Sequence, residues 1–287
     1  MNILLVRRKT KRRSTAIGLK AKITEVTRKF IVFGIQQALC CIFPVAIFIT
    51  LAVSKSVTIP GLARYDFILI ICLLLQICMV LFRLENFSEL KVICLFHIIG
   101  LCLELYKIHM GSWSYPESAI FKIGGVPLYS GFMYASVASY ICQSWKRLHL
   151  RLINMPKPFL SLILIILIYA NFFTHHFTYD MRWILFACVF VVFFKSKFIY
   201  TICGSVYKLP VALSFLLIGF FIWIAENIST FFNAWQYPHQ AHVWQPVHIQ
   251  KISSWFLLVI ISIMIVAELK RLQAKNLKNK TRMQREH

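Results

Sequence analysis

Acidic residues are scarce in this chain of 287 residues. It holds 10 aspartates and glutamates against 32 lysines and arginines, which gives a formal net charge of +22 at pH 7. Strongly basic chains often bind nucleic acid, but here the basic residues gather at both ends of the chain and in alternate loops. That distribution is typical of membrane topology. The expected partner is therefore a lipid bilayer, with anionic headgroups near the basic ends, and no nucleic acid.

The sequence also lacks the signatures of common enzymes and channels. It contains no Walker loop, no Gly-x-Ser-x-Gly, no His-Glu-x-x-His, no dinucleotide-binding fingerprint and no TVGYG filter. Its nine cysteines fall almost entirely inside apolar runs, and none lies in a loop expected to face outward. Hydrolase, ATPase, dinucleotide-dependent and potassium-channel functions therefore have no support, and a disulfide framework is not expected.

Apolar residues are abundant instead. They make up 59% of the chain, with a mean hydropathy of +0.70. Runs such as 159–173, "FLSLILIILIYANFF", and 215–225, "FLLIGFFIWIA", are apolar on every side. Helices of this kind lie in lipid or in a large core, and their number here favours lipid. The sequence predicts an all-α, polytopic integral membrane helical bundle.

Eight segments have the roughly 20 apolar residues that a spanning helix needs. The predicted spans cover about 30–53, 65–83, 90–106, 126–145, 158–175, 181–200, 209–226 and 252–269. Pro44 predicts a kink in the first of them. If the N-terminus is cytoplasmic, 26 of the 32 lysines and arginines lie inside and 6 outside, as the positive-inside rule requires. We expect a multi-pass cell-membrane protein with both termini in the cytoplasm.

A thirteen-residue pattern occurs twice, as "ELYKIHMGSWSYP" from Glu104 and as "ENISTFFNAWQYP" from Glu226. With an offset of 122, Glu104, Trp113, Tyr115 and Pro116 correspond to Glu226, Trp235, Tyr237 and Pro238. A Tyr-Asp pair also recurs, at 65–66 and 179–180. These matches predict two parallel four-span repeats related by an axis along the membrane normal.

The duplication divides the chain into five parts. They are a basic cytoplasmic N-terminal arm (1–29), a first four-span half (30–147), a basic cytoplasmic linker (148–157), a second four-span half (158–269) and a basic cytoplasmic tail (270–287). In this arrangement both copies of the pattern lie at the outer membrane face.

Glu104 and Glu226 are the first candidates for chemistry, because an ionisable residue inside a span usually faces a cavity or a partner. His97 lies two helical turns before Glu104 on the same face, and Gly100 between them gives another helix room to approach. Burial favours the protonated form of a carboxyl. The two glutamates and His97 are therefore candidate catalytic residues. The alternative is structural pairing with a basic residue such as Lys107 or Arg182.

The aromatic residues of the pattern allow two interpretations. Trp113, Tyr115, Trp235 and Tyr237, together with Asn171, are candidate substrate-binding residues whose ring faces would stabilise a cation. Alternatively, these tryptophans and tyrosines form ordinary interfacial belts and the following prolines end a turn, so that the pattern is a folding corner used twice.

Histidines gather in two loops that are expected to face outward. His175 and His176 follow the fifth predicted span, and His239 and His242 follow the seventh. Together with nearby carboxylates they would supply enough ligands for a zinc or iron ion. The alternative is that they are solvated side chains at the membrane interface.

Three segments carry a family resemblance: 104–141, "ELYKIHMGSWSYPESAIFKIGGVPLYSGFMYASVASYI", 169–186, "YANFFTHHFTYDMRWILF", and 221–238, "FIWIAENISTFFNAWQYP". They resemble the bacterial membrane proteins grouped as domain of unknown function 817, the YoaT-like family, over roughly residues 30–270. The resemblance implies a bacterial multi-spanning membrane protein and no established activity.

A second likeness is to the carotenoid hydratase and lycopene cyclase membrane families. It rests on a span that ends in glutamate, an aromatic loop and "GGVPLYSGFMY", while the loop spacing and the histidines differ. This likeness implies protonation of a double bond in a long isoprenoid, with Glu104 as the acid and Glu226 as its counterpart.

Three classes of function fit these residues. The first is an intramembrane enzyme that acts on a lipophilic, isoprenoid-like molecule by glutamate acid catalysis near the outer face. The second is a proton-coupled transporter built from two parallel repeats. The third is a non-catalytic membrane scaffold. A scaffold predicts no enclosed polar cavity, and a transporter predicts a water-accessible path that reaches the cytoplasmic side. Whether Glu104 and Glu226 converge on one cavity is therefore the most informative observation.

Overall fold

The computed structural model describes residues 22–283, and side chains as far as residue 273. Most of the basic arm (1–29) and the end of the basic tail therefore lie outside the described residues. In chain order the elements are the helical segment Lys22–Cys40, α2 (Ile42–Val53), α3 (Arg64–Leu81), α4 (Phe87–His109), β1 (Lys122–Ile123), β2 (Val126–Pro127), α5 (Ser130–Arg147), β3 (Arg151–Ile153), α6 (Pro158–Thr174), α7 (Arg182–Val192), β4 (Lys197–Ile202), β5 (Ser205–Pro210), α8 (Val211–Phe231), the 3₁₀ turn η1 (Pro238–Gln240) and α9 (Lys251–Met283).

Helices occupy all eight ranges in which the sequence predicts spans, but they differ in length and polarity. Among the described residues, four helices are long and apolar enough to cross a membrane: α3, α4, α8 and the Lys251–Gln273 part of α9. The bent pair Lys22–Cys40 and Ile42–Val53 would be a fifth. The apolar helices α6 and α7 have 17 and 11 residues, so they are shorter than a typical span. The fold is mostly helical, with membrane-compatible helices.

The first predicted span is broken, as Pro44 suggests. The two helical pieces meet at Cys41 and are bent by 64°. Pro44 lies in the first turn of α2, where it has no N–H to donate to the carbonyl of Cys40 one turn earlier. The helix therefore restarts at Ile42 in a new direction.

The sixth predicted span, 181–200, ends early. Helix α7 stops at Val192, and the chain then forms strand β4, which pairs antiparallel with β5 and with β3 from the linker 148–157. A two-residue turn joins β4 to β5, with positive φ at Cys203 and Gly204, the geometry that a tight hairpin requires. This three-stranded sheet is absent from the all-α expectation.

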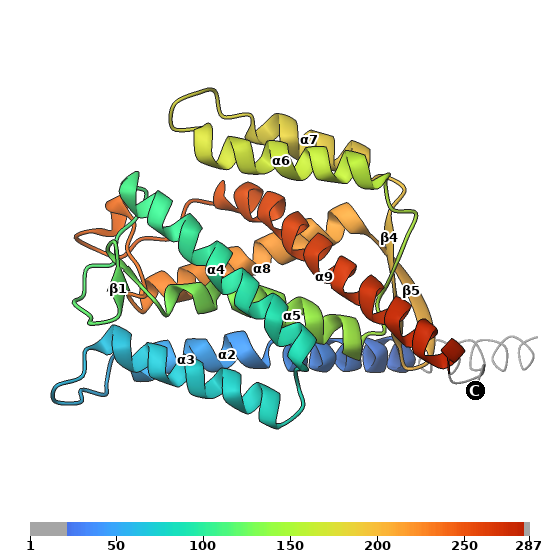
Figure 1. The fold of residues 1–287 in the computed structure, drawn as a ribbon, viewed down its shortest axis with the longest axis horizontal. Coiled ribbons are helices and arrows are strands. Elements are labelled where there is room, and N and C mark those ends of the chain that lie inside the picture. Colours follow the sequence, from blue (N-terminus) through green and yellow to red (C-terminus); the bar gives the residue numbers. More distant parts are fainter. Residues whose placement is uncertain (1–21, 284–287) are drawn as a thin grey trace, which may run out of the picture.

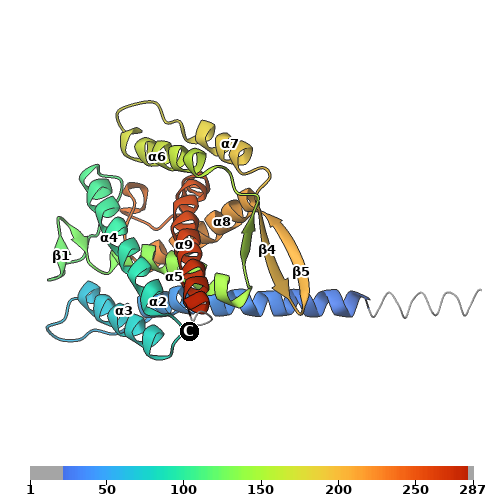
Figure 2. The same cartoon turned by 45° about the vertical axis from the view of Figure 1, so that its right-hand side comes forward.

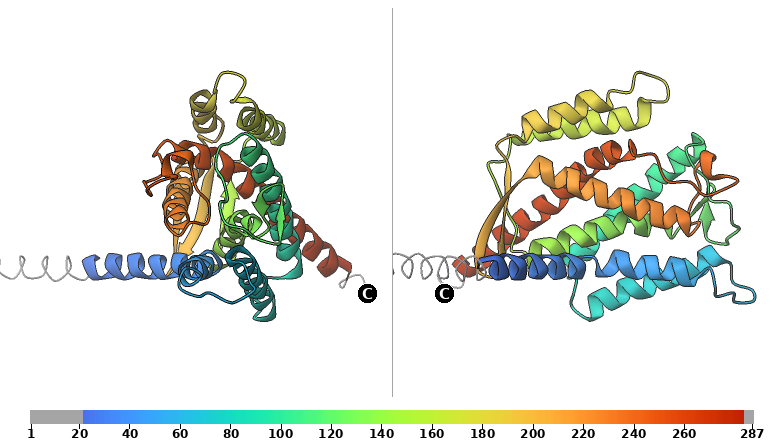
Figure 3. Two further views of the ribbon diagram at one scale, coloured as in Figure 1. Left: turned by 90° about the vertical axis from the view of Figure 1, so that its left-hand side faces the viewer. Right: turned by 180° about the vertical axis from the view of Figure 1, so that it is seen from behind.

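The helices form a central bundle with a pair of helices on each flank. The hairpins α4/α5 and α8/α9 cross in the middle, α2/α3 lies on one side and α6/α7 on the opposite side (Figure 1). The loops before and after η1 and the β1/β2 hairpin lie at one end, whereas β3, β4 and β5 lie at the other (Figures 1 and 3). The segment Lys22–Cys40 leads away from the bundle beside β4 and β5 (Figure 2).

Two polar side chains at the start of α3, the buried Asp66 and the half-buried Arg64, fix the loop end. The carboxylate of Asp66 accepts hydrogen bonds from the backbone N–H groups of Ile120 and Phe121, at 2.8 and 3.0 Å. Arg64 binds Glu117 at 2.5 Å and donates to the carbonyl oxygen of Phe232 at 2.5 Å. The loops after α4 and α8 are thus tied to the same helix end.

Candidate functional site

Glu104 lies near the C-terminal end of α4 and is almost fully buried, with 5% of its surface exposed. Its Oε2 accepts hydrogen bonds from the indole N–H of Trp113 at 2.7 Å and from the phenol of Tyr115 at 3.0 Å. Its Oε1 accepts one from the phenol of Tyr134, on α5, at 2.8 Å. The loop that follows α4 therefore folds back onto its own glutamate.

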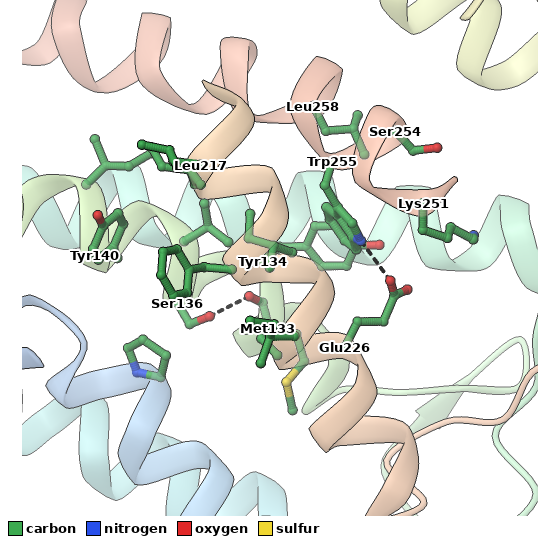
Figure 4. Close-up of a pocket in the computed structure, with 18 of the residues that line it drawn as sticks. Met133, Tyr134, Ser136, Tyr140, Leu217, Glu226, Lys251, Ser254, Trp255 and Leu258 are labelled. Atoms are coloured by element: carbon green, nitrogen blue, oxygen red, sulfur yellow. Dashed lines mark hydrogen bonds between the residues drawn. The ribbon is translucent and has the colours of Figure 1, made fainter. Parts of the chain in front are cut away.

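Glu226 is held in a closely similar way near the end of α8, with 3% of its surface exposed. Its Oε1 accepts a hydrogen bond from the phenol of Tyr237. Its Oε2 accepts one from the indole N–H of Trp255, on α9, at 2.8 Å (Figure 4). Each glutamate thus bonds the tyrosine eleven residues later and an aromatic residue of the next long helix.

The two loops meet at corresponding residues. Ser114 and Gln236, which are 122 residues apart, exchange both backbone hydrogen bonds at 2.9 Å as an isolated antiparallel bridge. Beside the bridge, the rings of Trp113 and Tyr237 lie edge to face with centroids 5.9 Å apart. An antiparallel bridge between corresponding residues is the contact expected at a local two-fold axis.

Close helix packing brings Tyr134 to Glu104. A Cβ atom on Gly100 would lie 2.5 Å from the Tyr134 ring, so only glycine leaves room for that ring against α4. The packing is reciprocal, because Gly131 of α5 faces the His97 ring in the same way. Gly100 thus gives another helix room to approach α4, as the sequence predicts. His97 instead packs edge to face on Phe132, with centroids 4.7 Å apart.

Both glutamates line a single cavity of about 710 Å³. The aromatic residues of both loops line it as well, together with Tyr134, Trp255 and Asn171. Away from the glutamates its wall is mainly apolar, with Gln37, Tyr140 and Ser144 among the exceptions, and it extends to Tyr200 and Leu209 of the sheet. Figure 4 shows Glu226, Tyr134 and Trp255 beside this space, with Leu217 and Leu258 on its wall.

Basic side chains surround the polar end of the cavity. The Lys251 ammonium lies 4.8 Å from the ring centre of Tyr237 and 5.2 Å from that of Trp113, and it interacts electrostatically with Glu226. Lys107 donates to the carbonyl oxygen of Phe172 at 3.1 Å. Among the described residues no salt bridge joins a lysine or arginine to either glutamate, so the alternative, structural pairing with Lys107 or Arg182, is not formed. Arg182 binds Asp180 instead, at 3.0 Å.

The protonation chemistry of the two carboxyls follows from their donors. An indole N–H can only donate, so one oxygen of each carboxyl always accepts a hydrogen bond. A phenol both donates and accepts, so the other oxygen can gain a proton if the phenol hydroxyl turns around. Burial raises the pKa of Tyr115 and Tyr237 well above the ordinary value, and the neighbouring glutamates raise it further. Both phenols therefore stay neutral.

The four candidate metal ligands fall into two groups. The rings of His175 and His176 lie 4.1 Å apart, whereas His239 stacks near Tyr237 and His248, and His242 is exposed. Within residues 22–273, no three histidine, cysteine or carboxylate side chains are placed to hold a metal ion. Burial lowers the pKa of His175 and His176, and the nearby Lys107 lowers it further, so both rings are neutral near pH 7. Of these histidines, only His175 lines the cavity.

Three residues of the site are missing from the sequence-based selection: Tyr134, Trp255 and Lys251. A usable signal exists for the first two, because Tyr134 follows Glu104 by 30 residues and Trp255 follows Glu226 by 29. The near-identical spacing extends the recurrence into the next helix. Lys251 has no counterpart in the other copy of the pattern, where position 129 is tyrosine.

The fold and the cavity define a predominantly helical protein with membrane-compatible helices and two carboxylates buried beside one apolar cavity. The chain belongs to the family described as "Protein of unknown function (DUF817)", which matches residues 29–263. The "Uncharacterized protein YoaT" of Bacillus subtilis (strain 168) is 56% identical over 249 residues, which cover 87% of this chain and 94% of that protein. No solved structure matches the chain. The family resemblance is therefore confirmed, and neither description names an activity.

Proposed function

We propose that this protein is an intramembrane enzyme that protonates a lipophilic, isoprenoid-like molecule bound in the cavity. One observation carries the proposal: Glu104 and Glu226, from separate helices, converge on the polar end of one large apolar cavity. A cavity of several hundred Å³ with apolar walls and a few convergent polar groups is typical of a small-molecule site. A non-catalytic scaffold requires no such cavity.

The proposed step is proton transfer from a carboxyl to an alkene carbon. The alkene π electrons form the new C–H bond, and the other alkene carbon becomes a cation. The cation then takes up water and releases a proton, or loses a proton directly, and a proton returns to the carboxylate. The four loop aromatics line the cavity, so their ring faces can stabilise the cation.

Glu104 is the better candidate for the acid. Three donors hold its carboxyl in place, and Tyr134 provides a phenol that can turn to share the proton. Glu226 would be its counterpart, assisted by Tyr237 and placed near the Lys251 ammonium. His97 would support α4 from its packing on α5, and Asn171 would contact the substrate. No step uses a metal ion.

The proposal includes eight spans in two parallel four-span repeats, with both termini cytoplasmic. Three observations support the repeats: helices lie in all eight ranges, the Ser114–Gln236 bridge joins corresponding residues, and the two glutamates are bound alike. The distribution of lysine and arginine supports the orientation. In this arrangement the glutamates lie near the outer face and the basic ends lie near anionic headgroups.

Deuterium incorporation tests the proposed reaction. Membranes containing the protein are incubated in D₂O with an isoprenoid-rich lipid extract, and the lipids are analysed by mass spectrometry. Protonation of an alkene transfers a deuteron to carbon, where it does not exchange during extraction. We expect deuterated lipids with the wild type and a loss of at least about tenfold with Glu104→Gln, because removing a general acid typically slows a reaction about 10²–10⁴-fold.

Glu268→Gln is the matched control, since Glu268 is a helix glutamate that pairs with Arg271 on the surface. It should leave incorporation unchanged. Equal incorporation in Glu104→Gln and wild type, with both proteins inserted in equal amounts, would show that Glu104 is not the acid. No incorporation in any sample would argue against alkene protonation.

A proton-coupled transporter is the second candidate, and the length of the cavity favours it. The lining residues run from the loop end to Tyr200 and Leu209 beside the sheet, at the opposite end of the bundle. Parallel repeats with membrane-embedded acids also occur in transporters. A transporter would give no deuterium on carbon in the D₂O experiment. In vesicles containing the protein, it would give a proton flux that depends on Glu104 and Glu226.

A further inference from the structure

In the part of the chain that the structure describes, the exposed part of the cavity wall lies on two helices only. Of the residues that line the cavity, four are exposed on the outside of the bundle: Val45 on α2 and Leu217, Phe221 and Ile228 on α8. Their exposed fractions are 46%, 43%, 64% and 37%. Each of them lies both on the cavity wall and on the outer surface of the bundle, so the wall is a single side chain thick at these positions of α2 and α8.

The packing of α2 leaves this part of the wall weakly closed. Helix α2 is short and begins at a 64° bend, and it packs mainly on α3 and α5, with only sparse contact to α8. In the view from behind, α2 and α8 both lie on the near face, with α5 behind them (Figure 3, right). Pro44 and Phe48, next to Val45, also line the cavity. This part of α2 thus forms one edge of the thin wall.

The chemistry of the thin wall indicates what passes through it. All four exposed lining residues are apolar, and α8 is one of the helices that are long and apolar enough to cross a membrane. An opening with apolar edges in a membrane helix faces hydrocarbon, where a polar solute is excluded. The charged side chains that line the cavity lie instead at the helix ends nearest the loops; they are Glu104, Lys107, Arg182, Glu226 and Lys251.

We infer that the cavity opens sideways into the bilayer between α2 and α8, and that its ligand is a membrane lipid with a long hydrocarbon chain that enters from the hydrocarbon phase. The chain occupies the apolar length of the cavity, and its reactive or polar group lies at the glutamates. This inference rests on the proposed function for the role of the glutamates, and it adds the ligand class and the route. It excludes water-soluble substrates from the site.

Photocrosslinking from inside the cavity tests the inference. The photoreactive residue p-benzoylphenylalanine replaces Leu258, a half-buried residue of α9 on the cavity wall, in protein held in nanodiscs of bacterial lipid. After irradiation, the intact protein is weighed by mass spectrometry. We expect adducts with the mass of a lipid. No lipid adduct at this position would overturn the ligand class.

Blocking variants test the route. Val45→Trp and Leu217→Trp place an indole at the two edges of the opening. Their matched controls are Ile49→Trp, one turn further along α2, and Leu213→Trp, one turn earlier on α8, which are exposed to 58% and 39% but do not line the cavity. We expect adduct formation at Leu258 to fall several-fold with the blocking pair and to stay unchanged with the control pair. Equal adduct yields in both pairs would show that lipid does not enter between α2 and α8.

This experiment separates the inference from the proposed reaction. Crosslinking needs no proton transfer, so adducts at Leu258 report entry of lipid whether or not the lipid is protonated. Adducts without deuterium incorporation would leave the lipid site standing and remove the acid catalysis. Deuterium incorporation without adducts at Leu258 would leave the reaction standing and remove the lipid chain from the cavity. Incorporation with adducts insensitive to the blocking pair would leave the reaction standing and remove the lateral opening.

Discussion

At the scale of single residues, both buried glutamates accept hydrogen bonds from two elements: the loop that follows their own helix and the next long helix. Each carboxyl oxygen of Glu104 and Glu226 accepts at least one hydrogen bond from an aromatic side chain. A buried charge or polar group without such partners is strongly unfavourable. The same aromatics line the cavity, so they hold the carboxyls in place and also face any ligand. Their structural role is therefore compatible with the binding role that we propose.

The Trp255–Glu226 hydrogen bond gives a first prediction. Trp255→Phe removes the only donor that reaches Oε2 of Glu226 from the described residues. Leaving a buried acceptor unsatisfied costs about 1–3 kcal/mol, so the melting temperature in detergent should fall by several degrees. Trp145→Phe is the control, because Trp145 lines the same cavity but its indole N–H has no hydrogen-bond partner among residues 22–273. An equal fall in both variants would assign the effect to lost packing alone.

Gly100 gives a second prediction. In Gly100→Ala the new Cβ would lie 2.5–2.8 Å from three atoms of Tyr134, so α5 must shift and the Tyr134–Glu104 hydrogen bond must weaken. Overpacking of this kind costs about 1–3 kcal/mol. Gly34→Ala is the contrasting variant, since nothing lies within 4 Å of the added atom and alanine favours a helix by about 0.5–1 kcal/mol. Thermal melting of the two variants should shift in opposite directions.

Sequence reasoning finds some of these residues and misses others for a physical reason. Glutamates in apolar runs and a recurring aromatic pattern are visible in one dimension, so Glu104, Glu226 and their loop tyrosines are predictable. Tyr134 and Trp255 are ordinary aromatic residues of the next helices. Their role depends on how closely those helices pack. Gly100 indicates that some helix approaches α4 closely, but it does not indicate which residue of that helix reaches Glu104. His97 is on the expected face of α4, but another helix covers it.

At the scale of elements, helix positions are predictable and helix ends are less so. The apolar run of 181–200 continues through strand-forming residues, and hydropathy alone does not distinguish the end of α7 at Val192 from the start of β4 at Lys197. What ends the helix is pairing of β4 with both β3 and β5. That pairing brings together the linker 148–157 and residues about 50 positions later, which no local pattern reveals.

A buried ion-pair cluster joins three helices and gives a third prediction. Glu89 of α4, which is fully buried, binds Lys146 of α5 and Lys270 of α9, each at 2.5 Å. Removing one partner of a buried pair costs about 3–5 kcal/mol, and partial exposure of the lysines places Glu89→Gln at the lower end of this range. Glu268→Gln breaks an exposed pair, worth about 0–1 kcal/mol. If both variants unfold at the same denaturant concentration, the cluster does not hold the helices together.

The loop between α3 and α4 gives a prediction about pH. Burial raises the pKa of Glu85 above its ordinary value of 4.5, and the nearby Glu89 adds to this, while Ser139, Gln76 and Lys146 oppose it. The folded state therefore binds a proton that the unfolded state has released, and stability from this group is lost as pH rises above 4.5. Glu85→Gln should raise the melting temperature at pH 8 and change it little at pH 4.5. An equal change at both pH values would contradict this assignment.

At the scale of the whole molecule, the chain has two chemically different ends. One end carries the loops, the glutamates and the aromatic residues, and the other carries the sheet and the helical segment Lys22–Cys40 (Figure 1). The cavity extends between the two ends, and its lateral opening lies along its length. This polarity allows one lipid chain to lie along the bundle with its reactive group at a defined depth.

Cysteine labelling tests the orientation of that polarity. Cys203 is exposed in the β4–β5 turn at the sheet end, and His242 is exposed in the loop after η1 at the opposite end. Because lysines and arginines favour the cytoplasmic side, the sheet end should be inside and the loop end outside. A membrane-impermeant maleimide should label His242→Cys, made in a Cys203→Ser background, in intact cells. The parent protein should be labelled at Cys203 only after permeabilisation, and Cys203→Ser alone gives the background from the other cysteines. Labelling of Cys203 in intact cells, with no labelling at position 242, would show that the topology is the reverse of the one proposed. The glutamates would then lie near the cytoplasmic face, while the lateral opening between α2 and α8 would be unaffected.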